Sequence, residues 1–333
     1  VPMLSLDSSA EADEVREFDR RVREAVGEVR YSAEPKFDGF SVEVVYEGGR
    51  LDRAVTRGNG EAGEDVTENV RTIHTVPLSL RDAPETLVLR GEVYMPRSGF
   101  ADLNRRRVER GEEPFANPRN AAAGTVRHLD PGVVAERPLA VYFYDVMDTT
   151  AEVSSQAEAF ELMRGLGLRV DEDNRLVDDV DAAISYRDEM LDRRDDLEYE
   201  IDGVVLKVDD YAARGEMGST SAHPRWAFAY KFPPRSGRTT VRGITVQVGR
   251  TGKLTPVALL DPVDVTGVTI SRATLHNAEQ ARELGVGVGA VVTVERAGDV
   301  IPQVAEVLEP GEGTFEMPEQ CPVCGEDVVR EGP

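Results

Sequence analysis

Glu34-Pro35-Lys36-Phe37-Asp38-Gly39 places a lysine between two carboxylates, directly after a proline that fixes φ and lacks an N–H donor. Apolar residues alternate with polar ones on either side, over residues 31–33 and 40–46, which predicts strands. We therefore expect Lys36 at the mouth of a sheet, where its ammonium can be desolvated as a nucleophilic lysine requires. Taken alone, K-x-D-G is better explained by a surface lysine in a turn, and the motifs downstream decide between the two readings.

Further motifs follow this stretch in a fixed order. They are T-R-G-N-G (56–60), G-E-D-V-T (63–67), R-G-E-V (90–93), A-N-P-R-N-A-A-A-G (116–124), I-D-G-V-V-L-K (201–207) and K-F-P (231–233). This order resembles that of bacterial-type NAD-dependent DNA ligases, members of the nucleotidyltransferases that attach a nucleoside monophosphate to a lysine. The N-P-R-N-A-A-A-G run is typical of that family and not of its ATP-using relatives. The resemblance covers almost the whole chain.

The resemblance implies an α+β fold with three parts. Residues 1–235 would form a nucleotidyltransferase (ATP-grasp-like/ligase) domain of antiparallel sheets with flanking helices, residues 236–312 an OB-fold barrel, and residues 313–333 the start of a zinc finger. Independently, short β-branched runs with glycine turns from about 239 to 309 predict a small barrel. The length of 333 residues favours about two domains.

The resemblance also implies a nucleotide site. Lys36 is the expected nucleophile, Asp38 the group that orients the lysine or the metal, and Glu34 the acceptor for the adenine amino group, since an ionised carboxylate only accepts. Other implied nucleotide contacts are Ser5, Leu6, Arg57, Glu92, Arg194, Lys207 and Lys231. From the residues alone, Ser5 and Leu6 would pass as core, Arg57 as a turn arginine, Glu92 as an exposed strand residue, and the lysines as snorkelling at strand ends. Asn59 stands where the family usually has aspartate, so the role of a carboxylate there is in doubt.

Arginines are the expected DNA contacts. Arg119 and Arg127 resemble the family's contacts to the 5′-phosphate at a nick, and a guanidinium can bind two phosphate oxygens at once. We interpret the Arg105-Arg106-Arg107 run as a solvated helix face. In the expected barrel, phosphate contacts could come from Arg250, Lys253, Arg272 and Arg296.

The charge of the chain conflicts with a DNA partner. There are 62 acidic residues against 39 Lys and Arg, a net charge of −23, whereas DNA-binding proteins usually carry a basic footprint. Adaptation to high salt would explain this balance, because the Debye length shrinks to about 3 Å at 1 M salt. A halophilic source is therefore our interpretation.

The cysteine count and the hydropathy bear on the compartment. No stretch approaches the roughly 20 apolar residues of a spanning helix, so no membrane partner is expected. Two cysteines do not make a disulfide framework, which favours the cytoplasm. Cys321 and Cys324 form a C-x₂-C pair that is half of a tetrahedral zinc site, although a redox pair or two spare thiols would fit as well. In the family the site has four cysteines, so we expect zinc in the full-length protein and poor zinc binding here.

The expected reaction has three steps: Lys36 takes AMP from NAD, AMP passes to the 5′-phosphate of a nick, and the 3′-hydroxyl displaces AMP. It would use NAD and Mg²⁺ (or Mn²⁺), and the partner would be nicked double-stranded DNA, bound by a monomer in replication and repair. We expect the chain to be part of a longer protein whose nicotinamide-binding domain and C-terminal modules are absent, so that it adenylylates itself poorly from NAD. The alternatives are an ATP-dependent ligase or capping enzyme, and a non-catalytic DNA-binding module.

Overall fold

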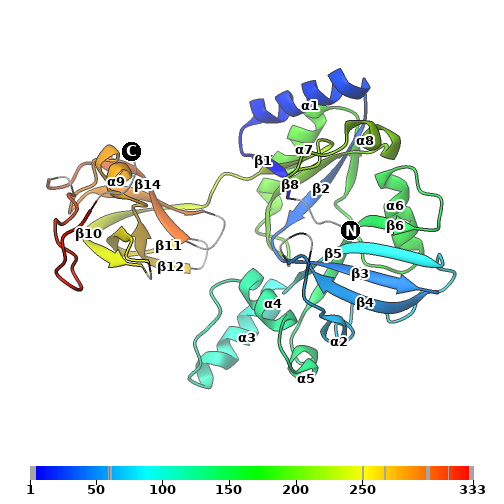
Figure 1. The fold of residues 1–333 in the computed structure, drawn as a ribbon, viewed down its shortest axis with the longest axis horizontal. Coiled ribbons are helices and arrows are strands. Elements are labelled where there is room, and N and C mark those ends of the chain that lie inside the picture. Colours follow the sequence, from blue (N-terminus) through cyan, green and yellow to red (C-terminus); the bar gives the residue numbers. More distant parts are fainter. Residues whose placement is uncertain are drawn as a thin grey trace. The chain divides into compact units, whose positions relative to one another are not determined.

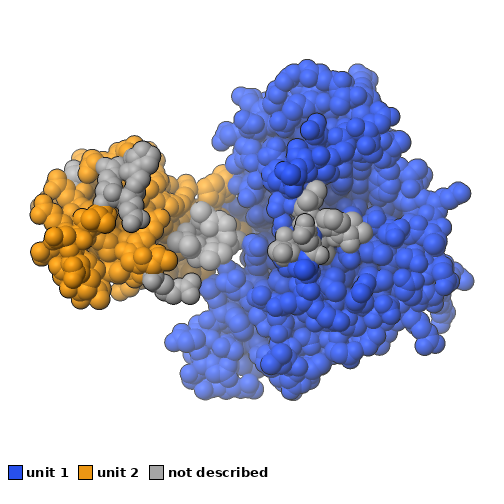
Figure 2. Space-filling view, viewed as in Figure 1, with its two compact units in different colours: residues 1–232 blue, residues 233–333 orange. Residues whose placement is uncertain are grey.

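In a computed structural model of the chain, the described residues are 5–58, 60, 62–249, 251–265, 268–297, 301–313 and 315–329, without the side chains of 296, 297 and 301. They fall into two compact units, residues 1–232 and residues 233–333 (Figure 2). Asn59, Arg250 and the side chain of Arg296 lie outside the described residues. No helix in the described ranges is both long and apolar enough to cross a membrane.

The first unit contains two sheets, the larger of which has the strand order β1-β9-β8-β2-β7 (Figure 1). Its strands are β1 (Asp7–Ser9), β2 (Tyr31–Phe37), β7 (Arg175–Val177), β8 (Ile201–Val208) and β9 (Ala227–Lys231). Three helices pack on it: α1 (Ala12–Val26), α7 (Val180–Arg193) and α8 (Tyr211–Met217). Helix α1 buries Val15, Phe18 and Val22, which recur at helical spacing and cover the sheet because their apolar surface leaves water there.

The second sheet has the order β4-β3-β5-β6. Its strands are β3 (Phe40–Glu47), β4 (Arg50–Thr56), β5 (Thr86–Tyr94) and β6 (Ala140–Thr149). Helices of this half are α2 (Thr67–Val70), α3 (Arg97–Glu109), α4 (Pro118–Val126), α5 (Pro131–Ala135) and α6 (Gln156–Gly165). Gly48 and Gly49 link β3 to β4 with φ values of 52° and 72°, which a two-residue hairpin of type I′ requires.

The K-x-D-G stretch carries the chain from one sheet to the other. β2 of the larger sheet ends at Phe37, and β3 of the smaller sheet begins at Phe40. A Cβ on Gly39 would lie 2.5 Å from the carbonyl oxygen of Val93, so only glycine fits where the chain passes β5. Phe37 also stacks on Tyr142 of β6 at a centroid distance of 5.0 Å, which packs the two sheets together next to the lysine.

The second unit is a closed five-stranded barrel with one short helix, α9 (Ala278–Glu283). Its strands are β10 (Ser236–Val248), β11 (Leu254–Val265), β12 (Val268–Thr274), β13 (Val291–Ala297) and β14 (Ile301–Glu309). The long strand β10 pairs with β11 through one half and with β13 through the other, which closes the barrel. A five-stranded barrel of this size is typical of OB-folds, as expected from the strand pattern.

Candidate active site

Lys36 lies in β2, opposite Gly203 of β8. Its Nζ donates hydrogen bonds to both oxygens of Asp202, at 2.6 and 2.8 Å. Both side chains are about one-quarter exposed, at 25% and 28%, so the lysine is held in place and yet open to a substrate. A charge-assisted bond of this kind fixes the position of the amine nitrogen.

Three of the four lysines in the chain share one face of the larger sheet. Lys36, Gly203 and Lys231 stand in one row across β2, β8 and β9. Residues that pair directly in antiparallel strands point to the same face, and two strand spacings separate Lys36 from Lys231 by about 10 Å. Lys207 lies four residues after Gly203 and so projects from the same face. Gly203, in the middle of the row, carries no side chain.

Lys207 is bound to carboxylates rather than free. Its Nζ lies 2.8 Å from Oε2 of Glu34 and 3.4 Å from Oδ2 of Asp145, and it donates to the carbonyl oxygen of Tyr144 at 3.0 Å. Lys207 and Glu34 are both buried. Burial raises the pKa of Glu34, while Lys207 and a hydrogen bond from Ser32 oppose that shift. The pair places an acceptor and a donor side by side at the floor of the site.

Lys231 differs from Lys207 in its surroundings. It is the last residue of β9 and is exposed. Arg194 follows helix α7, where Arg97 donates to its backbone carbonyl oxygen at 2.9 Å. The Arg194 guanidinium lies 5.8 Å from the ring centroid of Phe232, the residue after Lys231. The two predicted phosphate-binding cations therefore come to the same end of the sheet.

Glu92 is buried in β5 of the second sheet, beside β3. Ser41 Oγ donates to its Oε2 at 2.6 Å. Burial raises the pKa of Glu92 to about 7, even though Ser41, Lys36 and Arg119 favour the ionised form. A Cβ on Gly39 would lie 2.8 Å from Cγ of Glu92, so the glutamate packs directly against the glycine of the lysine stretch.

Arg119 and Asp38 form an ion pair with Nη1 and Oδ1 3.0 Å apart. Asn117 caps the start of α4 by accepting from the Asn120 N–H, and Pro118 occupies the first turn, so N-P-R-N is a helix start that fixes Arg119. Arg119 is about half exposed, whereas Asp38 is buried. Asp38 therefore positions Arg119, while the direct partner of Lys36 is Asp202. Arg127 follows α4, exposed, with its guanidinium 5.4 Å from the Phe40 ring centroid.

Arg57 and Ser5 also come together. Nη2 of Arg57, just after β4, donates to Ser5 Oγ at 2.6 Å. The carbonyl oxygen of Ser5 lies 3.2 Å from Nδ1 of His223. Leu6 is half-buried beside it in sequence. These three predicted nucleotide contacts therefore lie next to one another.

Three polar residues in the site were given no role from the sequence: Asp202, Asp145 and Ser41. Asp202 stands inside the I-D-G motif, so its motif was visible while its contact with Lys36 was not. The residue after Asp202 has to be glycine, because a Cβ on Gly203 would lie 2.5 Å from the Tyr230 carbonyl oxygen of β9. Asp145 follows five apolar or aromatic residues in β6, which is the one signal that could have marked it.

Cys321 and Cys324 are free thiols in a tight turn, in which the Gly325 N–H donates to the Cys321 carbonyl oxygen at 2.9 Å. Backbone hydrogen bonds lower the pKa of Cys321. Across the described ranges, no group of three or more His, Cys, Asp or Glu side chains could hold a metal ion. Two thiolates supply half of a tetrahedral zinc site, so the residues present do not complete one.

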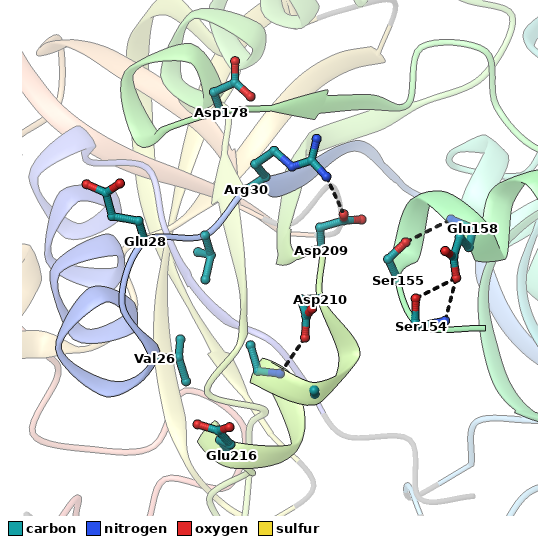
Figure 3. A pocket seen from close by; sticks show the side chains of 13 residues that line it. Val26, Glu28, Arg30, Ser154, Ser155, Glu158, Asp178, Asp209, Asp210 and Glu216 are labelled. Atoms are coloured by element: carbon teal, nitrogen blue, oxygen red, sulfur yellow. Dashed lines mark hydrogen bonds and ion pairs between the residues drawn. The ribbon is translucent and has the colours of Figure 1, made fainter. Parts of the chain in front are cut away.

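A hollow in the first unit lies away from these residues, with a volume of about 730 Å³ (Figure 3). Its wall includes Glu28, Glu158, Asp178 and Glu216, together with an Arg30–Asp209 ion pair at 3.8 Å. None of the predicted site residues lines it. We place the candidate site at the lysines because the predicted site residues meet there, whereas six carboxylates and one arginine are among the residues that line the hollow.

Comparison with known proteins gives consistent matches. Residues 1–235 match the family described as NAD-dependent DNA ligase adenylation domain, and residues 238–314 that of the NAD-dependent DNA ligase OB-fold domain. A DNA ligase of Haloferax volcanii is 62% identical over 334 residues, covering 100% of this chain and 48% of that protein. A DNA ligase of Haloarcula marismortui is 60% identical, covering 99% and 48%.

The organisms of these relatives agree with the interpretation of the acidic composition as an adaptation to salt. The chain spans about half the length of the curated relatives it matches. The family match extends over more than half of the chain and includes the lysine stretch, the paired carboxylates and the capped helix start. The chain therefore belongs to the family of NAD-dependent DNA ligase adenylation domains, followed by the OB-fold domain of the same ligases.

Proposed function

We propose that this chain is the adenylation and OB-fold part of an NAD-dependent DNA ligase, in which Lys36 carries AMP from NAD to the 5′-phosphate of a nick. The observation that supports this most strongly is the Lys36–Asp202 contact at 2.6 Å on a sheet face shared with Lys207 and Lys231. In a chain with only four lysines, three on one face support a site for a nucleotide.

The buried Glu34–Lys207 pair fits the edge of adenine. Adenine offers an amino donor at N6 and, next to it, an acceptor at N1. Glu34 can accept and Lys207 can donate, and their charged atoms lie 2.8 Å apart. We propose that these residues read the base, so that Lys207 contacts the base and Lys231 the phosphate. Glu92 would accept from a ribose hydroxyl, and Ser5, Leu6 and Arg57 would enclose the nucleotide.

In the first step, Lys36 releases a proton to water and its neutral amine attacks the adenylyl phosphorus of NAD. A P–N bond forms, the bond to the bridging oxygen breaks, and nicotinamide mononucleotide leaves with that oxygen. Asp202 holds the amine in position, and Lys231 and Arg194 stabilise charge that develops on the phosphate oxygens. Covalent catalysis then divides nick sealing into easier displacements.

The carboxylates near Lys36 fit a magnesium ion only together with substrate. Mg²⁺ is usually bound by one or two carboxylates plus phosphate oxygens, and Asp202 is the candidate carboxylate here. When bound, the ion would neutralise phosphate charge during transfer. Arg119, positioned by Asp38, and Arg127 would bind the 5′-phosphate of the nick. On the barrel, Lys253 and Arg272 are exposed and could bind backbone phosphates.

Incubation with NAD or ATP, each labelled in the adenylyl group, tests the proposal. We expect slow labelling from NAD and none from ATP, together with sealing of a nick that already carries AMP on its 5′-phosphate. Labelling from ATP alone would favour an ATP-dependent enzyme. Neither labelling nor sealing would favour a non-catalytic DNA-binding module. A monomer in the cytoplasm remains our prediction.

A further inference from the structure

Guanidinium groups gather around the C-terminal end of α3. We call Arg106, Arg107, Arg110 and Arg137 the α3 arginine cluster. Residues 97–137, which include it, hold eight arginines against six carboxylates, in a chain whose net charge is −23. The rest of the chain therefore repels a polyanion, while this segment attracts one.

Phe115 holds the cluster together. The guanidinium carbon of Arg107 lies 4.5 Å from its ring centroid and that of Arg137 lies 6.0 Å from it. Asn104 of α3 fixes the backbone of Phe115, since its amide donates to the Phe115 carbonyl oxygen at 2.9 Å and accepts from the Phe115 N–H at 2.8 Å. Arg107 is only 22% exposed, so the solvated face expected from the sequence is wrong for this residue.

The positive charge of the cluster is only partly compensated. Arg107 pairs with Glu112 at 2.8 Å. Arg106 and Arg110 are exposed, and neither forms an ion pair with another described residue. Nη1 of Arg137 is buried without a hydrogen-bond partner in the part of the chain that the structure describes. Burial and the neighbouring arginines lower the pKa of Arg137. Anions would relieve this repulsion.

The cluster is connected to the reactive lysine through one helix. Helix α3 packs against α4, and α4 packs on β3 and β5 of the smaller sheet (Figure 1). Phe115 lies two residues before the cap of α4, and Arg119 in its first turn binds Asp38 of the lysine stretch. Basic groups therefore run from the lysine stretch through Arg119 to α3. Duplex DNA carries one charge per roughly 1.7 Å of axis, so a strand bound at Arg119 offers further phosphates along this path.

We propose that the α3 arginine cluster binds the sugar-phosphate backbone of duplex DNA next to the nick, as a contact separate from Arg119 and Arg127. The inference rests on the proposed function, because it takes nicked DNA as the substrate. The contact is independent of sequence, since the cluster offers guanidinium groups to phosphates and no groove-reading element.

The test is the salt dependence of DNA binding by an Arg106→Gln/Arg110→Gln variant. Arg107 and Arg137 stay in place, so the packing around Phe115 is preserved. The matched control is Arg16→Gln/Arg20→Gln, which removes two exposed arginines at the same spacing from α1. Fluorescence anisotropy would give the Kd for a labelled nicked duplex over a KCl series. We expect the α3 variant to bind at least about tenfold more weakly at the lowest salt, with the slope of log K against log[KCl] reduced by about 2.

An unchanged Kd and slope for the α3 variant would overturn the inference. It would also be overturned if the α3 variant bound double-stranded RNA more weakly than wild type does but bound the nicked DNA duplex equally well. An equal loss in the α1 control would also overturn it, because net charge rather than the cluster would then explain the effect. AMP labelling of Lys36 in the same wild-type preparation separates this result from failure of the proposed function. If wild type becomes labelled and the α3 variant binds DNA like wild type, only the proposal for the α3 arginine cluster is refuted. If wild type is neither labelled nor able to bind DNA, both the cluster and the proposed function are refuted.

Discussion

Lys36 and Asp202 are 166 residues apart in the sequence, and their charged groups lie 2.6 Å apart in the structure. The contact forms because β2 and β8 pair with Lys36 opposite Gly203. Asp202 thus fixes the position of the amine, while both side chains stay open to a substrate. Under the proposed function, Asp202 would act as a positioning residue for the first chemical step.

Asp202→Asn should slow AMP transfer to Lys36 by about 10- to 100-fold, since a hydrogen bond to a charged group is worth about 1.5–3 kcal/mol. The initial rate of mass increase with NAD would measure this. Asp181→Asn, on the exposed surface of α7, is the control and should react like wild type. An unchanged rate in Asp202→Asn would remove the positioning role.

Lys207→Met and Lys231→Met should separate two kinds of lysine. The first leaves Glu34 and Asp145 buried without their cation, so we expect a loss of about 3–5 kcal/mol in the free energy of unfolding. The second changes an exposed residue and should stay within about 0.5 kcal/mol of wild type while impairing AMP transfer. Urea unfolding in high KCl would measure both changes in stability. Equal unfolding midpoints for the two variants would contradict the stabilising role of the buried Glu34–Lys207 pair.

Glu92→Gln should change the pH dependence of stability. The pKa of Glu92 is raised to about 7, so the folded state holds a proton that the unfolded state releases at lower pH. This group therefore costs stability as pH rises from about 4.5 to above 7. Glutamine does not titrate, so the variant should gain up to about 3 kcal/mol over wild type at pH 8 and little at pH 4.5. Parallel urea-unfolding profiles across that range would argue against a buried, protonated carboxyl.

Salt should stabilise the folded chain. With a net charge of −23, self-repulsion opposes the compact state, and KCl screens it. The urea midpoint should rise between about 0.1 and 2 M KCl. The same series in sucrose, which stabilises proteins without screening charge, serves as a control. A midpoint that stays flat in KCl would contradict the salt-adaptation reading.

Local patterns predicted much of the fold. The strands on either side of Lys36 and the short strands of the barrel were expected from alternation and turn residues, and both are present. Ser8 and Glu11 have the spacing of a capping box, but Ser8 pairs with Ala229 and extends the larger sheet, so that α1 begins only at Ala12. Strand pairing with a distant segment outweighed the local signal there.

For the candidate site too, the sequence predicted individual residues but not the contacts between distant ones. Motif order predicted roles for Lys36, Glu92 and Arg119. The contacts between distant residues could not be read from spacing, since they depend on strand register: Asp202 on Lys36, and Glu34 with Asp145 on Lys207. The packing of Arg107 on Phe115 depends on the loop around Phe115, which Asn104 holds in place. The conformation of that loop cannot be predicted from hydrophobic periodicity.

The most direct test is the site of AMP attachment after long incubation with NAD and Mg²⁺ in high KCl, in wild type and Lys36→Ala. The chain has only four lysines, so peptide mass spectrometry can assign the adduct without ambiguity. We predict slow gain of one AMP on Lys36 in wild type and none in the variant. An adduct on another residue, or equal labelling of the variant, would contradict the assignment of Lys36 as the nucleophile.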